Sequence, residues 1–304
     1  MRSLVLVFVL SGCSAAVPVV RVEPSVPSTA ATKLEVCRLD SEVHHRGLWA
    51  AIDDVSFEPW HQVIGSIVVK HERGLLIIDP AFGEEIAADL RQAPLWFRLV
   101  MGGGHGKTPL VKLMDAAGLD PRAVRWVALT HAHWDHAGAL RDLPRTAIWL
   151  SAEEWTFVKS LKGHLDRGAI PRHFEIAAVR FAPFEFDEGP RDGFDRSHDL
   201  FGDGSVVAVP LPGHTPGSTG YLVQGLKDRW LFIGDAAWHL EGVKRPSSKM
   251  ALAAAAVDGD SEQTAQTLGL LHALHEARPD IQIVPAHDLD AMASVPVCSP
   301  PRPL

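Results

Sequence analysis

The chain has 304 residues, of which 46 % are hydrophobic, so it can build a substantial core and is not a generally disordered protein. The formal net charge is −8 with histidines neutral, and no basic run or stripe is visible, which argues against nucleic-acid binding. The 16 histidines are more than a chain of this size needs, so we expect some of them to bind metal.

The first residues have the layout of a secretory signal peptide. Arg2 precedes an apolar stretch, Leu4 to Leu10, that is too short to span a bilayer. The sequence Leu-Ser-Gly-Cys at positions 10–13 resembles the lipobox of bacterial lipoproteins. This resemblance implies a signal peptide of residues 1–12, acylation of Cys13 and, because Ser14 follows, an exported protein anchored in the outer membrane and facing the periplasm. An ordinary signal peptide that happens to contain a cysteine is the alternative.

Residues 13–33 are rich in proline and small side chains, which predicts a flexible, extended tether between the lipidated Cys13 and a folded domain over 34–304. Two further cysteines, Cys37 and Cys298, lie near the two ends of that domain. In an oxidising compartment they could form a disulfide that joins the ends, and two free thiols are an equally open reading.

The first half of the domain alternates strands and helices. Apolar runs predict strands over 64–70 and 75–79, joined by a tight turn at 72–74. Helical spacing follows over 84–92. A second helix is expected over 108–118, with Thr108 as its N-cap and Gly118 at its end. A strand over 124–130 then leads directly into a histidine-rich loop.

The second half repeats this pattern. Strands are predicted over 146–151, 205–211, 229–235 and 281–285, and helices over 152–161 and 261–277, the latter with Ser261 as its cap. The stretch from 162 to 204 is rich in Pro, Gly and charged residues and is expected to be irregular surface structure. Strands that end in polar loops, with helices between them, favour an α/β layered fold.

Candidate metal ligands follow four of the predicted strands. The loop Leu129 to Gly138, with the sequence LTHAHWDHAG, holds four of them within six residues, and three more lie at later strand ends. Seven nitrogen and oxygen ligands are too many for one tetrahedral zinc but suit two metals with a shared bridge. Imidazoles and carboxylates without thiolate favour zinc, iron or manganese. The seven residues are His131, His133, Asp135, His136, His214, Asp235 and His287.

The H-x-H-x-D-H motif, the G-H-T-P-G turn, the G-D strand end and the late histidine together resemble the metallo-β-lactamase superfamily, over roughly Val63 to Asp288. The resemblance implies an αββα sandwich with the site at one edge of two facing sheets. Asp79 matches an early aspartate that orients the ligand loop in the family. The implied ligand sets are His131, His133 and His214 for the first metal, Asp135, His136 and His287 for the second, and Asp235 as the bridge.

Two Zn²⁺ ions held in this way would share a hydroxide that attacks an acyl bond, and Asp135 has a spare oxygen that can carry the proton to the leaving group. Asp135 and Asp235 are therefore the expected catalytic side chains. True β-lactamases with this motif usually lack the bridging carboxylate, so Asp235 makes the chain resemble lactonases and related hydrolases. The residues after Asp235 do not match glyoxalase II. Lactonases often carry a tyrosine where this chain has Trp238, and that departure puts their usual mechanism in question.

The sequence thus predicts a metal-dependent hydrolase of a lactone or similar ester. The alternatives are a β-lactamase-like amide hydrolase and an iron-dependent oxidoreductase of the persulfide dioxygenase type. Trp134 and Trp238 are expected to line the substrate pocket, so the expected partner is a small molecule with an apolar acyl or aromatic part. Trp96 and Phe97 could add to that wall or serve in packing. The Gly-rich stretch 101–109 does not fit a phosphate-binding loop and is expected to be a flap.

Overall fold

The computed structural model describes residues 34–54, 56–95, 97–98, 107–143, 145–176 and 180–300. The predicted signal peptide, Cys13 and the tether lie outside these residues, as do Trp96 and residues 101–106 of the expected flap. Among the described helices, none is both long and apolar enough to cross a membrane.

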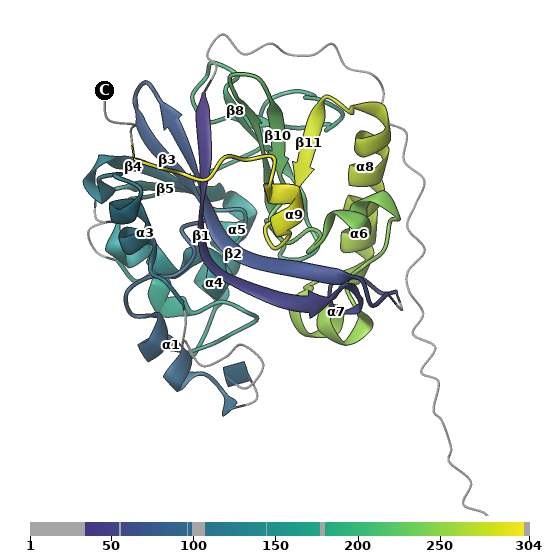
Figure 1. Cartoon of the computed structure of the whole chain (residues 1–304), viewed down its shortest axis with the longest axis horizontal. Coiled ribbons are helices and arrows are strands. Elements are labelled where there is room, and N and C mark those ends of the chain that lie inside the picture. Colours follow the sequence, from purple (N-terminus) through teal and green to yellow (C-terminus); the bar gives the residue numbers. More distant parts are fainter. Residues whose placement is uncertain are drawn as a thin grey trace, which may run out of the picture.

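Two sheets form the centre of the molecule (Figure 1). In the first sheet, β1, β2 and β3 are antiparallel neighbours, and β3 to β6 run parallel, in the order β1-β2-β3-β4-β5-β6. Its inner strands read as short apolar runs because a parallel sheet is covered on both faces. The strands are β1 (Glu35–Gly47), β2 (Pro59–His71), β3 (Gly74–Ile78), β4 (Val124–Ala128), β5 (Ala147–Ser151) and β6 (Arg180–Phe184).

The second sheet has the order β11-β10-β9-β8-β7. All of its neighbours are antiparallel except β10 and β11, which are parallel because α8 (Ser261–Ala277) lies between them in the chain. The strands are β7 (His198–Asp199), β8 (Val206–Pro210), β9 (Thr219–Gln224), β10 (Arg229–Phe232) and β11 (Ile281–Val284).

The buried side chains separate into layers that define an αββα sandwich, as the sequence predicted. One cluster, which includes Val69 and Ile78 of the first sheet and Ala208 and Phe232 of the second, fills the space between the sheets. Two others cover the outer faces, one under α3 and α5 and one under α6 and α8. Figure 1 shows these helices on opposite sides. The helices are α1 (Ile86–Gln92), α3 (Leu110–Ala116), α4 (Trp134–Ala137), α5 (Ala152–Ser160), α6 (Leu240–Lys244), α7 (Ala251–Val257), α8 and α9 (Leu289–Met292).

Three helix starts differ from the prediction. The helix expected over 84–92, α1, begins at Ile86. The N-cap of α8 is Asp260, not Ser261, because its Oδ1 accepts from the backbone N–H groups of both Glu262 and Gln263. A carboxylate at this place satisfies two otherwise unpaired donors and suits the positive end of the helix. α3 starts at Leu110, and Pro109 is its N-cap in place of Thr108.

The expectation that 162–204 is irregular surface structure was wrong for part of the stretch. It contains β6 and a short 3-10 helix, Pro171–His173, and it buries Phe184 and Phe194. Pro183 hid the strand in the sequence. Because β6 is the last strand of its sheet, a residue without an N–H is tolerated there.

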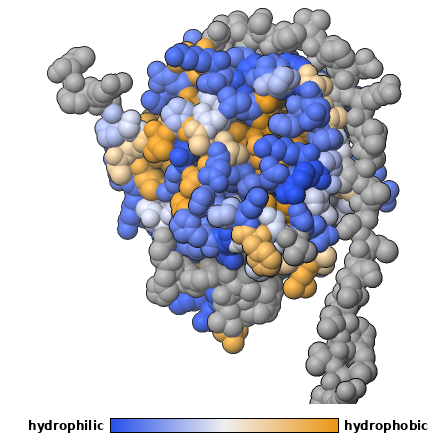
Figure 2. Space-filling view, turned by 45° about the vertical axis from the view of Figure 1, so that its right-hand side comes forward, coloured by the Kyte–Doolittle hydropathy of each residue, from blue (hydrophilic) through white to orange (hydrophobic). Residues whose placement is uncertain are grey.

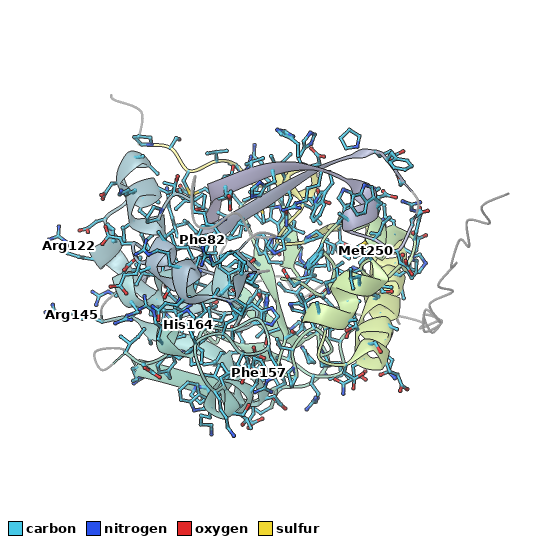
Figure 3. The ribbon with its side chains drawn as sticks, turned by 90° about the horizontal axis from the view of Figure 1, so that it is seen from below. Phe82, Arg122, Arg145, Phe157, His164 and Met250 are labelled. Carbon is cyan, nitrogen blue, oxygen red and sulfur yellow. A yellow bond between two sulfur atoms is a disulfide. The ribbon has the colours of Figure 1, made fainter. Side chains whose placement is uncertain are left out.

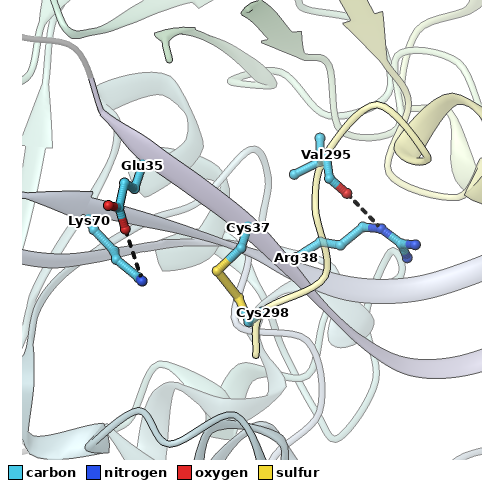
Figure 4. Close-up of a disulfide and its surroundings, with 6 residues drawn as sticks. All are labelled: Glu35, Cys37, Arg38, Lys70, Val295 and Cys298. Carbon is cyan, nitrogen blue, oxygen red and sulfur yellow. Dashed lines mark hydrogen bonds and ion pairs between the residues drawn. A yellow bond between two sulfur atoms is a disulfide. The ribbon is translucent and has the colours of Figure 1, made fainter. Parts of the chain in front are cut away.

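The two cysteines of the domain form a disulfide (Figure 4). Cys37 lies on β1 and Cys298 on the C-terminal segment that runs beside it, and Arg38 donates through Nε to the carbonyl of Val295 at 3.1 Å. Backbone hydrogen bonds between Arg38 and the same segment flank the bridge. Of the two readings that the sequence left open, the structure selects the bond that joins the two ends of the domain.

The surface carries few large apolar side chains. Phe57 and Leu252 are among the most exposed, and Figure 2 shows a face on which hydrophobic residues are scattered among hydrophilic ones. Single exposed apolar residues are normal on a folded chain and require no partner.

Candidate metal centre

All seven predicted ligands meet at one edge of the sandwich. Four follow β4, and the other three follow the ends of β8, β10 and β11. Gly234 allows the close approach of β10 to the β4 loop, because a Cβ at this position would lie 2.5 Å from Oγ1 of Thr130. Gly234 also has a φ of 52°, in the left-handed region that favours glycine.

The ligand atoms fall into three overlapping groups, and within each group they lie within 4.8 Å of one another. The first and third groups coincide with the two metal sets that the family resemblance implied, and the second joins them. The groups are His131, His133 and His214; His131, His136 and Asp235; and Asp135, His136 and His287.

Asp235 lies between the two sets. Its Oδ1 is 3.3 Å from Nε2 of His136 and 3.1 Å from Nε2 of His287, whereas its Oδ2 is 3.5 Å from Nε2 of His214. One carboxylate oxygen therefore faces each set, which is the arrangement that a bridging ligand requires.

The donor atoms fit a cation. Nε2 of His131, Nε2 of His136 and Oδ1 of Asp235 are buried and have no hydrogen-bond partner among the described residues. Nε2 of His214 and Nδ1 of His133 approach to 2.9 Å and point at the same space. Buried polar atoms are rarely left unpaired, and convergent imidazole nitrogens are the usual ligands of zinc.

The electrostatics of the site favour the metal-binding protonation state for His131, His133 and Asp235. Burial and the neighbouring imidazoles hold the pKa of His131 and of His133 well below the usual value, so both rings are neutral near pH 7. Burial alone would raise the pKa of Asp235, but the imidazoles of His287 and His136 outweigh it and hold that pKa well below the usual value. A neutral imidazole and an ionised carboxylate are the forms that bind a metal. For His136 and His287, burial would lower the pKa, but the nearby carboxylates outweigh it and hold the pKa above the usual value of an imidazole.

Four of the five imidazoles are oriented through their Nδ1 atoms, which leaves Nε2 facing the site. His131 contacts Thr130, whose hydroxyl in turn donates to Asp79, and His136 contacts Asp79 directly at 2.8 Å. His287 donates to the carbonyl of Val63 at 2.8 Å. Asp79 also accepts from the backbone N–H of Thr130 at 2.7 Å. These contacts are what the orienting role predicted for Asp79 requires.

The fourth ring is held by residues that sequence reasoning missed. Nδ1 of His214 lies 2.8 Å from Oδ1 of Asp258, and the ammonium of Lys249 donates to the same oxygen at 2.7 Å. The side chains of Lys249 and Asp258 are only 1 % and 2 % exposed. Asp258 is 44 residues from His214 in the chain, so no local pattern links the two.

Glu154 is a second support that the sequence did not reveal. It accepts from the N–H of Ala132 at 2.7 Å with one oxygen, and from the hydroxyl of Thr215 and the N–H of Gly217 with the other. It therefore joins the loop of His131 and His133 to the loop of His214. Burial raises the pKa of Glu154 to about 7, although the three donors oppose the shift.

Trp134 and Trp238, the two tryptophans predicted to line the substrate pocket, both lie in the wall of a cavity of about 80 Å³ over the candidate ligands. Trp134 packs on Phe82 and on Phe97, and Phe97 also lines this cavity. Trp238 has a polar contact that was not foreseen, because its Nε1 donates to Oδ2 of Asp235 at 2.8 Å. Of the expected flap, the buried Lys107 is described, and it forms an ion pair with Glu42 at the wall of this cavity.

Comparisons with known proteins agree with this geometry. The sequence model of one family, described as the metallo-beta-lactamase superfamily, matches residues 64–287. An N-acyl homoserine lactonase, AttM of Azorhizobium caulinodans, is 29 % identical over 234 residues, which cover 75 % of this chain and 82 % of AttM. A solved quorum-quenching N-acyl homoserine lactone lactonase has a TM-score of 0.65 at 14 % identity and covers 88 % of this chain and 98 % of its own. The solved dizinc lactonase AidC has a TM-score of 0.58 at 17 % identity, with 84 % and 87 % coverage.

Proposed function

The chain belongs to the metallo-β-lactamase superfamily and is a metallo-hydrolase of that fold, and from this premise we propose that it opens lactone rings. The proposed substrates are N-acyl homoserine lactones or closely related esters. The relative AttM is named as an N-acyl homoserine lactonase, and two solved proteins of the same fold are also described as lactonases.

The observation that carries the proposal is the position of Asp235. Its carboxylate turns one oxygen toward each ligand set, and the family resemblance associates a bridging carboxylate at this position with lactonases rather than with true β-lactamases. We propose two Zn²⁺ ions per chain as the cofactor, with iron or manganese as the other metals that this donor set accepts. When bound, the cations would polarise the acyl carbonyl and lower the pKa of the attacking water.

The side chains of this protein would have three tasks. Asp135 has a side chain that is 13 % exposed and lines the cavity, so its carboxylate can accept a proton and pass it to the leaving alkoxide. Trp238 fixes the orientation of Asp235 through its indole N–H. An indole cannot give up that proton in the reaction, so Trp238 orients where a tyrosine could also transfer a proton. Trp134 and Phe97 form an apolar wall that excludes water and suits an apolar acyl group.

A panel of substrates run on metal-quantified protein tests the proposal. N-acyl homoserine lactones, aryl esters, β-lactams, thioesters and phosphotriesters would be compared by kcat/KM, with metal content measured on the same sample. We expect lactones to be the best substrates and about two zinc ions per chain. Preferential turnover of β-lactams would support the amide hydrolase instead, and one iron per chain would support the oxidoreductase.

We also propose that the protein is exported and anchored in the outer membrane through lipidated Cys13. The support is the signal-like stretch 4–10 and the lipobox-like sequence that ends at Cys13. Cys13→Ser should move the protein from the membrane fraction to the soluble fraction of cells that express it. Retention of the variant in the membrane fraction would contradict the anchor.

A further inference from the structure

A second and larger cavity lies beside the metal centre. Its volume is about 510 Å³, and it shares His133, His214 and Val257 with the smaller cavity over the ligands. Its walls come from both halves of the sandwich, because Phe157 belongs to α5 and Ala256 to α7. Figure 3 labels Phe157 together with Met250, the residue that precedes α7. A group that occupies this cavity can thus be continuous with a group held at the metal ligands.

Both sides of the cavity are fixed to metal ligands. On one side, Asp258 is held between His214 and the buried Lys249, which ties the end of α7 to the centre. On the other side, the carbonyl of Gly168 accepts from the N–H of Trp134 at 3.0 Å. A Cβ at Gly168 would lie 2.6 Å from Nε2 of His133, so this loop lies directly against the ring. The cavity is therefore pre-formed, which lowers the entropic cost of binding a ligand there.

Arg167 lies in a tight turn at this cavity. Its φ of 45° and the φ of 77° at Gly168 belong to a two-residue hairpin turn, in which Asp166 and Ala169 exchange both backbone hydrogen bonds. Its guanidinium lies over the ring of Phe157 at 4.6 Å, and its Nη2 donates to the hydroxyl of Ser160 at 2.8 Å. Its Nε is paired with Oδ1 of Asp166 at 3.4 Å. Its Nη1 makes no hydrogen bond to any described residue, so one donor remains free on a side chain that is 52 % exposed.

Each of the two acidic residues that line the same cavity has one oxygen engaged. Oδ1 of Asp258 accepts from Lys249 and contacts His214, and Oδ1 of Asp260 caps α8, whereas Oδ2 of Asp258 is buried without a partner among the described residues. The remaining wall is largely apolar or small, with Pro216, Ala255 and Val257. The cavity therefore offers an apolar body and one available cationic donor, a combination that suits an acyl chain with an acceptor oxygen and disfavours a chain with a cationic end.

We propose that this cavity is the subsite for the acyl arm of the substrate. Arg167 donates a hydrogen bond to an acceptor oxygen, of a carbonyl or a carboxylate, toward the far end of that arm. The proposal rests on the lactone hydrolysis proposed above and adds the feature of the substrate that determines preference. Contact with the residues of α7 increases the affinity for an apolar arm, and the hydrogen bond from Arg167 increases it further for an arm that ends in a carboxylate.

Homoserine lactones with four different N-acyl arms test this subsite: acetyl, hexanoyl, 5-carboxypentanoyl and 6-aminohexanoyl. We expect KM of the zinc-loaded wild type to fall from acetyl to hexanoyl, to be lowest for the carboxylate arm, and to be highest among the longer arms for the amine. Arg167→Met should raise KM for the carboxylate arm about tenfold more than KM for hexanoyl, which is the scale of one charge-assisted hydrogen bond at a half-exposed position.

Ala256→Phe fills the cavity and should remove the difference between acetyl and hexanoyl, whereas Ala251→Phe, on the same helix but outside the cavity wall, should preserve it. An unchanged hexanoyl preference in Ala256→Phe, or an unchanged carboxylate preference in Arg167→Met, would overturn the subsite. Calorimetric binding of the four ring-opened N-acyl homoserines to zinc-loaded protein separates the two proposals. If lactones are not hydrolysed but the arms still bind in this order, and the variants lose it, then the reaction proposal fails and the subsite stands.

Discussion

The loop 129–138 and the segment 238–258 contribute to the same centre in different ways. The loop carries four of the candidate ligands in six residues and follows β4 of the first sheet. The segment carries no predicted ligand, yet Trp238 contacts Asp235, and Lys249 and Asp258 hold His214. Ligand identity is thus local in the sequence, whereas ligand orientation depends on residues that only the fold brings near.

This difference implies that a substitution of a candidate ligand in the loop should abolish metal binding, whereas a substitution in the segment should only lower the metal affinity. A metal ligand contributes a bond to the ion. A residue that contacts the ligand only restricts the orientation of its imidazole ring, and the loss of such a residue typically lowers metal affinity about 10- to 100-fold. The following variants test this ranking, in order of their expected effect on hydrolysis.

His131→Ala should have the largest effect, because His131 belongs to two of the three ligand groups. We expect loss of both metal retention and lactone hydrolysis, measured by elemental analysis after gel filtration and by kcat/KM. His239→Ala is a matched control, because this half-buried histidine lies within the segment but belongs to none of the ligand groups. A hydrolysis rate in His131→Ala equal to wild type would remove the proposed centre.

Lys249→Met should have the next largest effect. It leaves the carboxylate of Asp258 buried without its cation, so His214 loses a firm partner. We expect zinc affinity in chelator competition to fall about 10- to 100-fold. Lys244→Met removes the same charge from an exposed position in the same segment and should leave zinc affinity unchanged.

The double variant Lys249→Met/Asp258→Asn separates two causes of that loss. If the uncompensated charge is the whole effect, the double variant should recover zinc affinity, whereas a true orienting role predicts that it stays weak. Zinc affinity equal to wild type in Lys249→Met would mean that the segment covers the centre without orienting its ligands. The difference proposed between the loop and the segment would then be contradicted.

Glu154→Gln should have a moderate effect, because an amide offers only one acceptor oxygen to three donors. We expect hydrolysis to fall about tenfold, within the range for residues that orient ligand loops. The control is Glu153→Gln, which makes the same change at the neighbouring position of α5.

The same variant tests the pKa of Glu154. Below pH 4.5 the carboxyl is protonated in the folded and unfolded chains alike. Between pH 4.5 and about 7 only the folded chain retains the proton, so the free energy of unfolding falls as pH rises through this window. Relative to Glu154→Gln, metal-free wild type should lose up to about 3 kcal/mol from pH 4.5 to 8 in denaturant titrations. A difference that does not vary with pH would mean that Glu154 is ionised in the folded chain throughout.

The same distinction, between features that are local in the sequence and features that depend on distant residues, separates what could be predicted from the sequence from what could not. The β3 and β4 strands, the seven side chains that converge at the candidate centre and Asp79 could be named, because apolar runs are contiguous and the family motifs are short. Lys249 and Glu154 could not, since each acts on a loop that is distant in the chain. The β6 strand was missed because Pro183 and the charges around it resemble a loop, and only its place at the sheet edge makes it a strand. The cap of α8 was misplaced by one residue because Asp260 and Ser261 are both good caps.

The disulfide should have the smallest effect on hydrolysis. Cys37 lies on β1, which pairs with β2 along nearly its whole length, and β2 carries the Val63 carbonyl that holds His287. This ladder stays intact without the bridge, so we expect Cys37→Ser/Cys298→Ser to lower the free energy of unfolding by about 2–4 kcal/mol and leave kcat/KM and zinc affinity unchanged. Denaturant titration and chelator competition on the same samples measure both. A loss of zinc affinity in this variant would show that the disulfide helps to orient His287 through β1 and β2. Ligand orientation would then depend on a third region of the molecule.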